Sequence, residues 1–203
     1  MRLVALGLGL AGLWCVNAQA ADHLVPQDNF LPDFRDFQRQ VFKSVFSPDT
    51  VARAVVEPSF HREYAVAIRK DGAGYSVSYE QPETQLWRFF NQNDPKSSES
   101  IKMSRCSAKL DGVVAGHLVS AWRGMLEKTR KDESGMVGLD GTTYHFSMEA
   151  DGRALTGQAW TPDPATPPGK LAGIVDDLRD YCQDHSRSKL AKANGLALTL
   201  IDR

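Results

Sequence analysis

The chain has 203 residues, of which 42% are hydrophobic and 24% are charged, with 24 basic against 25 acidic side chains. This near-neutral balance excludes a nucleic-acid-binding protein driven by bulk positive charge and a polybasic protein of the membrane surface. The composition is that of an ordinary globular protein, which excludes wholesale disorder, and the length is sufficient for one sizeable core.

Residues 1–20 have the layout of a cleaved secretory signal peptide. A basic start at Arg2 precedes an uncharged run over 3–16, and Ala-Gln-Ala at 18–20 supplies the small residues that a signal peptidase reads. The uncharged run is shorter than the roughly 20 residues of a membrane-spanning helix, and no later stretch approaches that length. We therefore expect an exported protein without a membrane span, either periplasmic or secreted.

The remaining chain, 21–203, is expected to form a single domain after a loose N-terminal leader at 21–31. Pro32 suits the first turn of a helix, and apolar side chains then follow at helical spacing from Phe34 to Val45. The start of the domain is therefore predicted to be an amphipathic helix.

A helix-start pattern and a β-hairpin come next. Ser-Pro-Asp at 47–49 predicts a second short helix over about 48–56, which must end before Pro58. Apolar and polar side chains then alternate from Tyr64 to Tyr79 around an Asp-Gly turn at 71–72, and this period of two predicts a hairpin.

The middle of the chain is less clear. Residues 83–90 contain four large apolar side chains whose spacing is compatible with both a strand and a helix. A polar stretch over 91–100 predicts an exposed loop, and a short strand is expected over 101–106.

The second half of the chain has clearer periodicity. It predicts a helix over about 112–130, a second hairpin over 143–160, a stiff proline-rich segment at 161–169 and an amphipathic helix over 171–182. The final apolar run, 196–201, is expected to be an edge strand or a docked end. Because strands and helices do not alternate regularly, we predict an α+β fold: a mostly antiparallel sheet of four to six strands with amphipathic helices packed on one face.

Cys106 and Cys182 are the two cysteines outside the predicted signal peptide. An even pair in an exported protein predicts a disulfide, with two free buried thiols as the alternative. Two cysteines without close spacing fall short of a zinc site, and we expect neither a metal nor a cofactor.

No motif of nucleophilic, nucleotide-binding or metal chemistry is present, so catalysis remains undecided. His145 and Glu149 share one face of a predicted strand and could carry out general acid–base catalysis, although that face could equally be turned to water. His61 with Glu63 is a second, weaker pair of this kind. The acidic residues of the last amphipathic helix have the spacing of a magnesium–diphosphate motif but are interpreted as its solvated face: Asp176, Asp177 and Asp180.

Aromatic side chains next to loops suggest a binding surface. Trp87, Phe90 and Trp160 adjoin predicted loops, and Pro162 and Pro164 stiffen a segment that would lose little entropy on docking. The alternative interpretation is that these rings close the edge of the core.

The function we expect is that of an exported envelope protein that binds a partner protein without catalysis, such as an inhibitor or an immunity protein. The partner would be another envelope protein or a toxin enzyme, and not a nucleic acid. The alternative is a small envelope hydrolase that uses His145 and Glu149.

Overall fold

A six-stranded antiparallel sheet, in the order β4-β3-β2-β1-β5-β6, runs through the computed structural model, which describes residues 22–28, 31–72, 74–92, 95–131 and 140–202. The predicted signal peptide lies outside these residues. The strands are β1 (Thr50–Pro58), β2 (Tyr64–Asp71), β3 (Gly74–Pro82), β4 (Met103–Leu110), β5 (Thr142–Ala150) and β6 (Arg153–Trp160).

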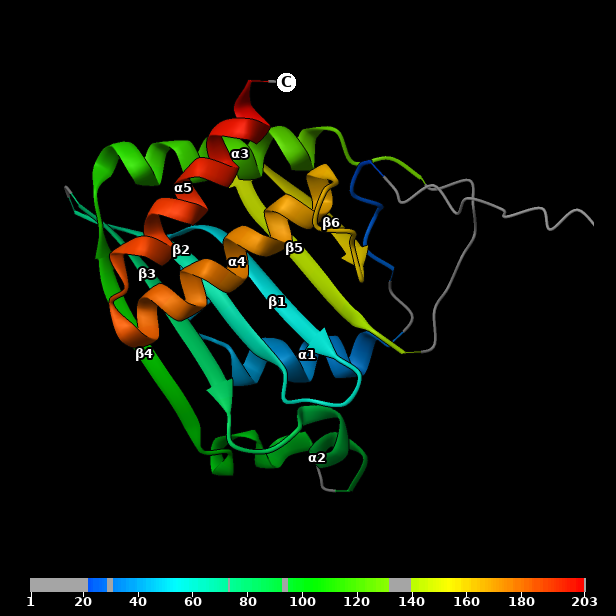
Figure 1. Cartoon of the computed structure of the whole chain (residues 1–203). Helices are drawn as coiled ribbons and strands as arrows, with labels where there is room; N and C mark the ends of the chain where they lie inside the picture. The colour runs from blue at the N-terminus through cyan, green and yellow to red at the C-terminus, as the bar shows by residue number, and fades with distance from the viewer. Residues whose placement is uncertain (1–21, 29–30, 73, 93–94, 132–139, 203) are drawn as a thin grey trace, which may run out of the picture.

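Helices cover both faces of this sheet. Figure 1 shows α4 and α5 crossing in front of the strands and α1 lying behind them. The helices are α1 (Pro32–Val41), α2 (Leu86–Gln92), α3 (Gly112–Glu127), α4 (Pro167–Asp184) and α5 (Arg187–Ile201), with a short 3-10 helix at Pro95–Ser100. The predicted α+β fold is confirmed, and α1 adds a second helical layer to the predicted one. Within the described ranges, no helix combines the length and the apolar character needed to cross a membrane.

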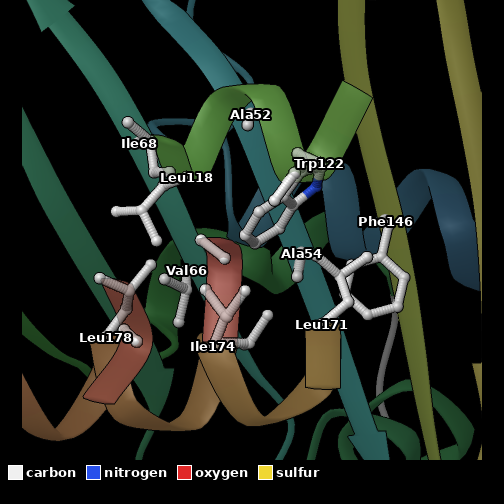
Figure 2. Packing of buried hydrophobic residues seen from close by; sticks show 14 of the residues in the cluster. Ala52, Ala54, Val66, Ile68, Leu118, Trp122, Phe146, Leu171, Ile174 and Leu178 are labelled. Carbon is white, nitrogen blue, oxygen red and sulfur yellow. The ribbon is translucent and has the colours of Figure 1, made fainter. Parts of the chain in front are cut away.

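The larger core lies between the sheet and α3, α4 and α5. Small side chains on the central strand, Ala52 and Ala54, leave room for the fully buried ring of Trp122, as Figure 2 shows. Trp122 meets the ring of Phe146 edge to face, with 5.7 Å between the centroids. Leucine and isoleucine side chains of α3 and α4 fill the rest of this layer: Leu118, Leu171, Ile174 and Leu178.

A smaller core lies on the opposite face, beneath α1. Phe34 and Phe37 point from α1 onto Val55 of β1 and onto the alanines of β2, where they are joined by Leu86 of α2. Phe34 also meets the ring of Trp87 edge to face, with the centroids 5.2 Å apart. The amphipathic helix predicted from Pro32 is therefore confirmed, and its apolar side chains seal the second face.

The central strand β1 replaces the predicted helix over 48–56, and that prediction was wrong. The amide of Thr50 donates to the carbonyl of Ser47, and the Ser47 hydroxyl donates to the Asp49 carboxylate, so the helix-start residues form a turn instead. The residues of the strand itself are rich in valine, which favours strands, and they pair with β2 on one side and β5 on the other.

Most other predicted elements are confirmed. Both hairpins and the helices α3 and α4 form, and the undecided segment 83–90 contains the start of α2. The apolar tail belongs to α5, which continues through Asn194 and Gly195. The leader is not loose where it is described, because Leu24 is fully buried and Val25 forms an antiparallel bridge with Gln158.

The predicted disulfide is confirmed. Cys106 and Cys182 are bonded, with 5.8 Å between their Cα atoms. The bond ties the edge strand β4 to α4, on the side of the sheet where the larger core lies.

Candidate functional site

A cleft of about 720 Å³ opens at the end of the sheet where β1 ends and β2 and β5 begin. Its walls come from five parts of the chain that are far apart in sequence. The lining includes Phe60, His61 and Arg62 of the β1–β2 loop, Tyr64 and Tyr144 of the sheet, Arg88 of α2, and Asp176 and Arg179 of α4.

The floor of the cleft is set by the register of three strands. Val56 of β1 pairs with Tyr64 on one side and with Tyr144 on the other, so both tyrosines stand at the same level of the sheet. They also stand on the same face, the one that α4 covers. α4 thereby brings Asp176 to both phenols, which donate to its two carboxylate oxygens at 2.5 and 3.1 Å.

Arg179, one helical turn after Asp176 on α4, is also part of this network. Its guanidinium donates to Asp176 at 3.1 Å and to Asp180 at 2.8 and 2.9 Å, and it lies over the ring of Tyr64 at 5.2 Å from the centroid. Asp176 thus accepts from three donors, and the charge of Arg179 is balanced by two carboxylates. The floor is therefore rigid and its charges are balanced internally.

Burial and the contact with Asp176 also keep the two phenols of the floor protonated. Burial, followed by the negative charge of Asp176, raises the pKa of Tyr64 and that of Tyr144 well above the ordinary value. Both phenols therefore remain neutral donors at neutral pH. A neutral, hydrogen-bonded phenol is a poor base and a poor nucleophile, so the two tyrosines are suited to donating hydrogen bonds.

The rim differs from the floor because its positive charges are not balanced. Phe60 is 73% exposed, and Arg62 and Arg88 are exposed beside it. Arg62 donates to the carbonyl of Pro82 at 3.4 Å. Among the residues that the structure describes, neither arginine has an acidic side chain within ion-pair distance. The mouth of the cleft is therefore basic, and it also carries one exposed aromatic ring.

None of the residues predicted to bind is among those that line this cleft, and Trp87 and Phe90 pack against Phe34 of α1. Trp87, 40% exposed, precedes Arg88 on α2, and the half-buried Phe90 stacks with it at 6.4 Å between centroids. Trp160, 42% exposed, ends β6. Its neighbour Thr161 bonds to Thr142, which lines the cleft. In the described chain, the ring of Trp160 makes no contact with the rings of Trp87 and Phe90. The predicted binding residues therefore fall into two separate groups.

The proline-rich segment is docked on the start of α4. Pro162 is half-buried and Pro164 is exposed. The carbonyl of Asp163 accepts from the backbone and the side chain of Thr166, which in turn caps α4. A Cβ on Gly169 would lie 1.8 Å from that carbonyl, so only glycine permits this approach. The last three residues of the predicted segment, 167–169, belong to α4, and the stiffness of the rest stays a prediction.

His145 does not face water. It is 6% exposed, beneath α1, and its Nε2 lies 3.2 Å from a carboxylate oxygen of Glu57 on the adjacent strand. Arg35 of α1 donates to the same carboxylate at 2.6 Å. Burial raises the pKa of Glu57, but the contacts with His145 and then Arg35 outweigh it, so the pKa is lowered. The predicted partner, Glu149, is exposed further along β5, and its catalytic role with His145 stays a prediction.

Two other acidic predictions need correction or refinement. Glu63 is buried and accepts from the amides of Leu86 and Trp87 at 2.7 and 3.0 Å, so it caps α2, while His61 alone reaches the cleft. The acidic residues of α4 were predicted to form a solvated face. However, Asp177 is only 2% exposed and is ion-paired with a lysine of α5, while Asp176 belongs to the cleft floor. Within the described ranges, no three histidine, cysteine or acidic side chains gather as metal ligands do.

Sequence reasoning missed the basic rim and the tyrosines of the floor. Arg62 and Arg88 are isolated single arginines in sequence, and Tyr144 was assigned to an ordinary apolar alternation. Only the strand order brings these residues together with Asp176. No family model, no curated protein and no solved structure matches the chain, so this geometry is the basis for any functional conclusion.

Proposed function

We propose that the protein is an exported envelope protein that binds a partner protein at this cleft, in the manner of an inhibitor or an immunity protein and without catalysis. The observation that carries the proposal is the basic rim: Arg62 and Arg88, which have no acidic partners among the described residues, line the same cleft as the exposed ring of Phe60. An acidic segment of a partner would supply the missing charge.

The energetics of such a surface favour binding. Arginine and aromatic side chains contribute most of the binding energy at protein interfaces when water is excluded around them. Because Tyr64, Tyr144 and Asp176 already hold one another, little order has to be created when a partner docks on the floor. The excess of positive charge at the rim would also speed the approach of an acidic partner.

The predicted aromatic and proline residues extend this surface on two sides. Trp87 and Phe90 adjoin the cleft through Arg88, and Trp160 adjoins it through Thr161. The docked segment with Pro162 and Pro164 presents a stiff border that would lose little entropy in a complex.

A comparative pull-down from an envelope extract tests the proposal. The baits are the wild-type protein, the cleft variant Arg62→Gln/Arg88→Gln, and the control Arg153→Gln/Arg187→Gln, which removes the same charge from positions outside the cleft lining. We expect a stoichiometric partner with the wild type and the control but not with the cleft variant. Absence of any stoichiometric partner, or equal capture by all three baits, would contradict the proposal.

A further inference from the structure

A second cavity, of about 280 Å³, lies beneath α1 on the other face of the sheet. α1 forms one side of it with Arg39, β1 contributes Arg53, and β5 contributes His145 and Ser147. It shares no lining residue with the cleft, so a ligand bound here would be independent of the proposed function.

The described charged side chains that line this cavity are all basic. Three arginines line it, and no described acidic side chain does. Arg35 is paired with Glu57 at 2.6 Å, and Arg39 lies 3.6 Å from the exposed Asp36. Arg53 differs from both, because among the described residues no carboxylate lies within ion-pair distance of it. One guanidinium at the cavity therefore lacks a counter-charge.

One hydrogen-bond donor of Arg53 is also without a partner among the described residues. Its guanidinium lies over the ring of Phe46, 4.6 Å from the centroid, and its buried Nε has no hydrogen-bond partner in the described part of the chain. Burial lowers the pKa of Arg53, the more distant charge of Glu149 raises it, and the like charge of Arg39 lowers it further. Arg53 itself is half-buried, and a guanidinium with a buried donor is usually compensated by a hydrogen-bonding partner.

His145 provides a second, independent observation that a hydrogen-bond partner is missing at this cavity in the described structure. It is buried, lines the cavity, and its Nδ1 has no hydrogen-bond partner among the residues that the structure describes. The contact with Glu57 involves the other ring nitrogen, Nε2. The hydroxyl-bearing side chains of Ser147 and Thr156 complete the polar lining, and Phe46 provides an apolar wall.

We propose that this cavity binds a small oxyanion, a phosphate or a short carboxylate, with Arg53 as its main charge partner and with His145 and Ser147 as further polar contacts. The guanidinium fork matches both oxyanions, which it can bind through two parallel hydrogen bonds. The volume is at the lower limit of small-molecule sites, which suits an ion of a few atoms.

Titration calorimetry of the protein without residues 1–20 tests the proposal, with inorganic phosphate in one series and succinate in the other. The variants are Arg53→Gln, which removes the charge, and Ser147→Leu, which fills the cavity and keeps every arginine. Arg153→Gln is the matched control. We expect one saturable site for at least one of the two ions, weakened about tenfold or more in both cavity variants and unchanged in the control. The series that saturates identifies the class of oxyanion.

Three results would overturn the proposal. The first is no binding of either ion, and the second is equal binding by Arg53→Gln and Arg153→Gln, which would indicate nonspecific charge screening. The third is unchanged binding by Ser147→Leu. Circular dichroism checks that each variant is folded. If a cavity variant does not fold, backbone NMR shifts of the wild type decide: changes must concentrate at Arg53 and Ser147, and shifts elsewhere contradict the site.

Discussion

The two faces of the sheet carry polar clusters made from the same kinds of residue, and they differ in whether the cluster is complete. On the face covered by α4, Asp176 accepts from Tyr64, Tyr144 and Arg179, and every charge of the floor has its counterpart. On the face covered by α1, Arg53 has neither a carboxylate partner nor a hydrogen bond at its buried Nε in the described structure. An arginine inside a complete network stabilises the fold, whereas one without a partner is the better candidate for a ligand site.

The largest expected effect concerns the disulfide, which joins β4 to α4 on the face that α4 covers. The double variant Cys106→Ala/Cys182→Ala should lose about 4 kcal/mol of unfolding free energy, because the unfolded chain regains the entropy of a long open loop. Urea unfolding with and without reductant measures this loss. Reductant should destabilise the wild type and leave the variant unaffected, and a loss near zero would contradict the role of the bond.

The next largest effect compares the stability lost when a residue of the network is removed with the stability lost when an exposed ion pair is removed. Asp176→Ala removes the common acceptor of two phenols and a guanidinium, and we expect a loss of about 2 kcal/mol, moderated because the carboxylate is partly exposed. The control is Asp36→Asn, whose exposed pair with Arg39 should contribute less than about 0.5 kcal/mol. Equal losses for the two variants in urea unfolding would show that the network has no special role.

At alkaline pH, the fall in the free energy of unfolding should come from the tyrosines of the floor, Tyr64 and Tyr144. In the unfolded chain these phenols ionise near their ordinary pKa of 10.0, whereas the folded state holds them neutral. The contribution of the two tyrosines to the unfolding free energy should therefore be fully present below pH 10 and should fall as the pH rises above 10. Unfolding of Tyr64→Phe/Tyr144→Phe at a series of alkaline pH values should give a flatter slope. An unchanged slope would contradict this assignment.

On the opposite face, Glu57 should contribute to the loss of stability at acid pH. The folded pKa of Glu57 lies below its ordinary value of 4.5, so its ionised form stabilises the protein fully above pH 4.5 and loses that effect as the pH falls through the folded value. Glu57→Gln should make the unfolding free energy less dependent on pH in this range. The variant Glu149→Gln, at an exposed position on the same sheet face, serves as the control and should keep the wild-type slope.

The smallest expected effect is at the rim of the cleft. Phe60→Ala removes a ring that is 73% exposed and should change the unfolding free energy by less than about 0.5 kcal/mol. The same variant should reduce capture of the partner in the pull-down. A large loss of stability would mean that Phe60 packs in the fold, and its exposure could not then be used as an argument for binding.

The periodicity of apolar residues predicted the elements whose structure is decided by neighbouring residues in the sequence. The hairpins followed from a period of two, and α4 followed from apolar residues three and four positions apart. The strand β1 was missed because Ser47 and Pro48 have the form of a helix start, while the contacts that decide the matter are its ladders with β2 and β5. Pairing between distant segments overrode a local signal.

The same reason limits what could be predicted of the two sites. His145 was recognised as a candidate, but its carboxylate partner, Glu57, follows a segment that was predicted to be a helix, so their pairing could not be foreseen. Tyr64 and Tyr144 become neighbours of Asp176 only because β1 lies between their strands. The disulfide was the exception, because two cysteines lie outside the predicted signal peptide and they allow one pairing.

The contrast between the complete and the incomplete cluster can be tested in one NMR experiment. The side-chain Nε–Hε signals of the arginines are followed while inorganic phosphate, or succinate if calorimetry favours it, is added to the protein without residues 1–20. We predict a saturable shift of the Arg53 signal while that of Arg179 stays in place. A shift of Arg179 as large as that of Arg53, or no shift of Arg53, would contradict the distinction between the two clusters.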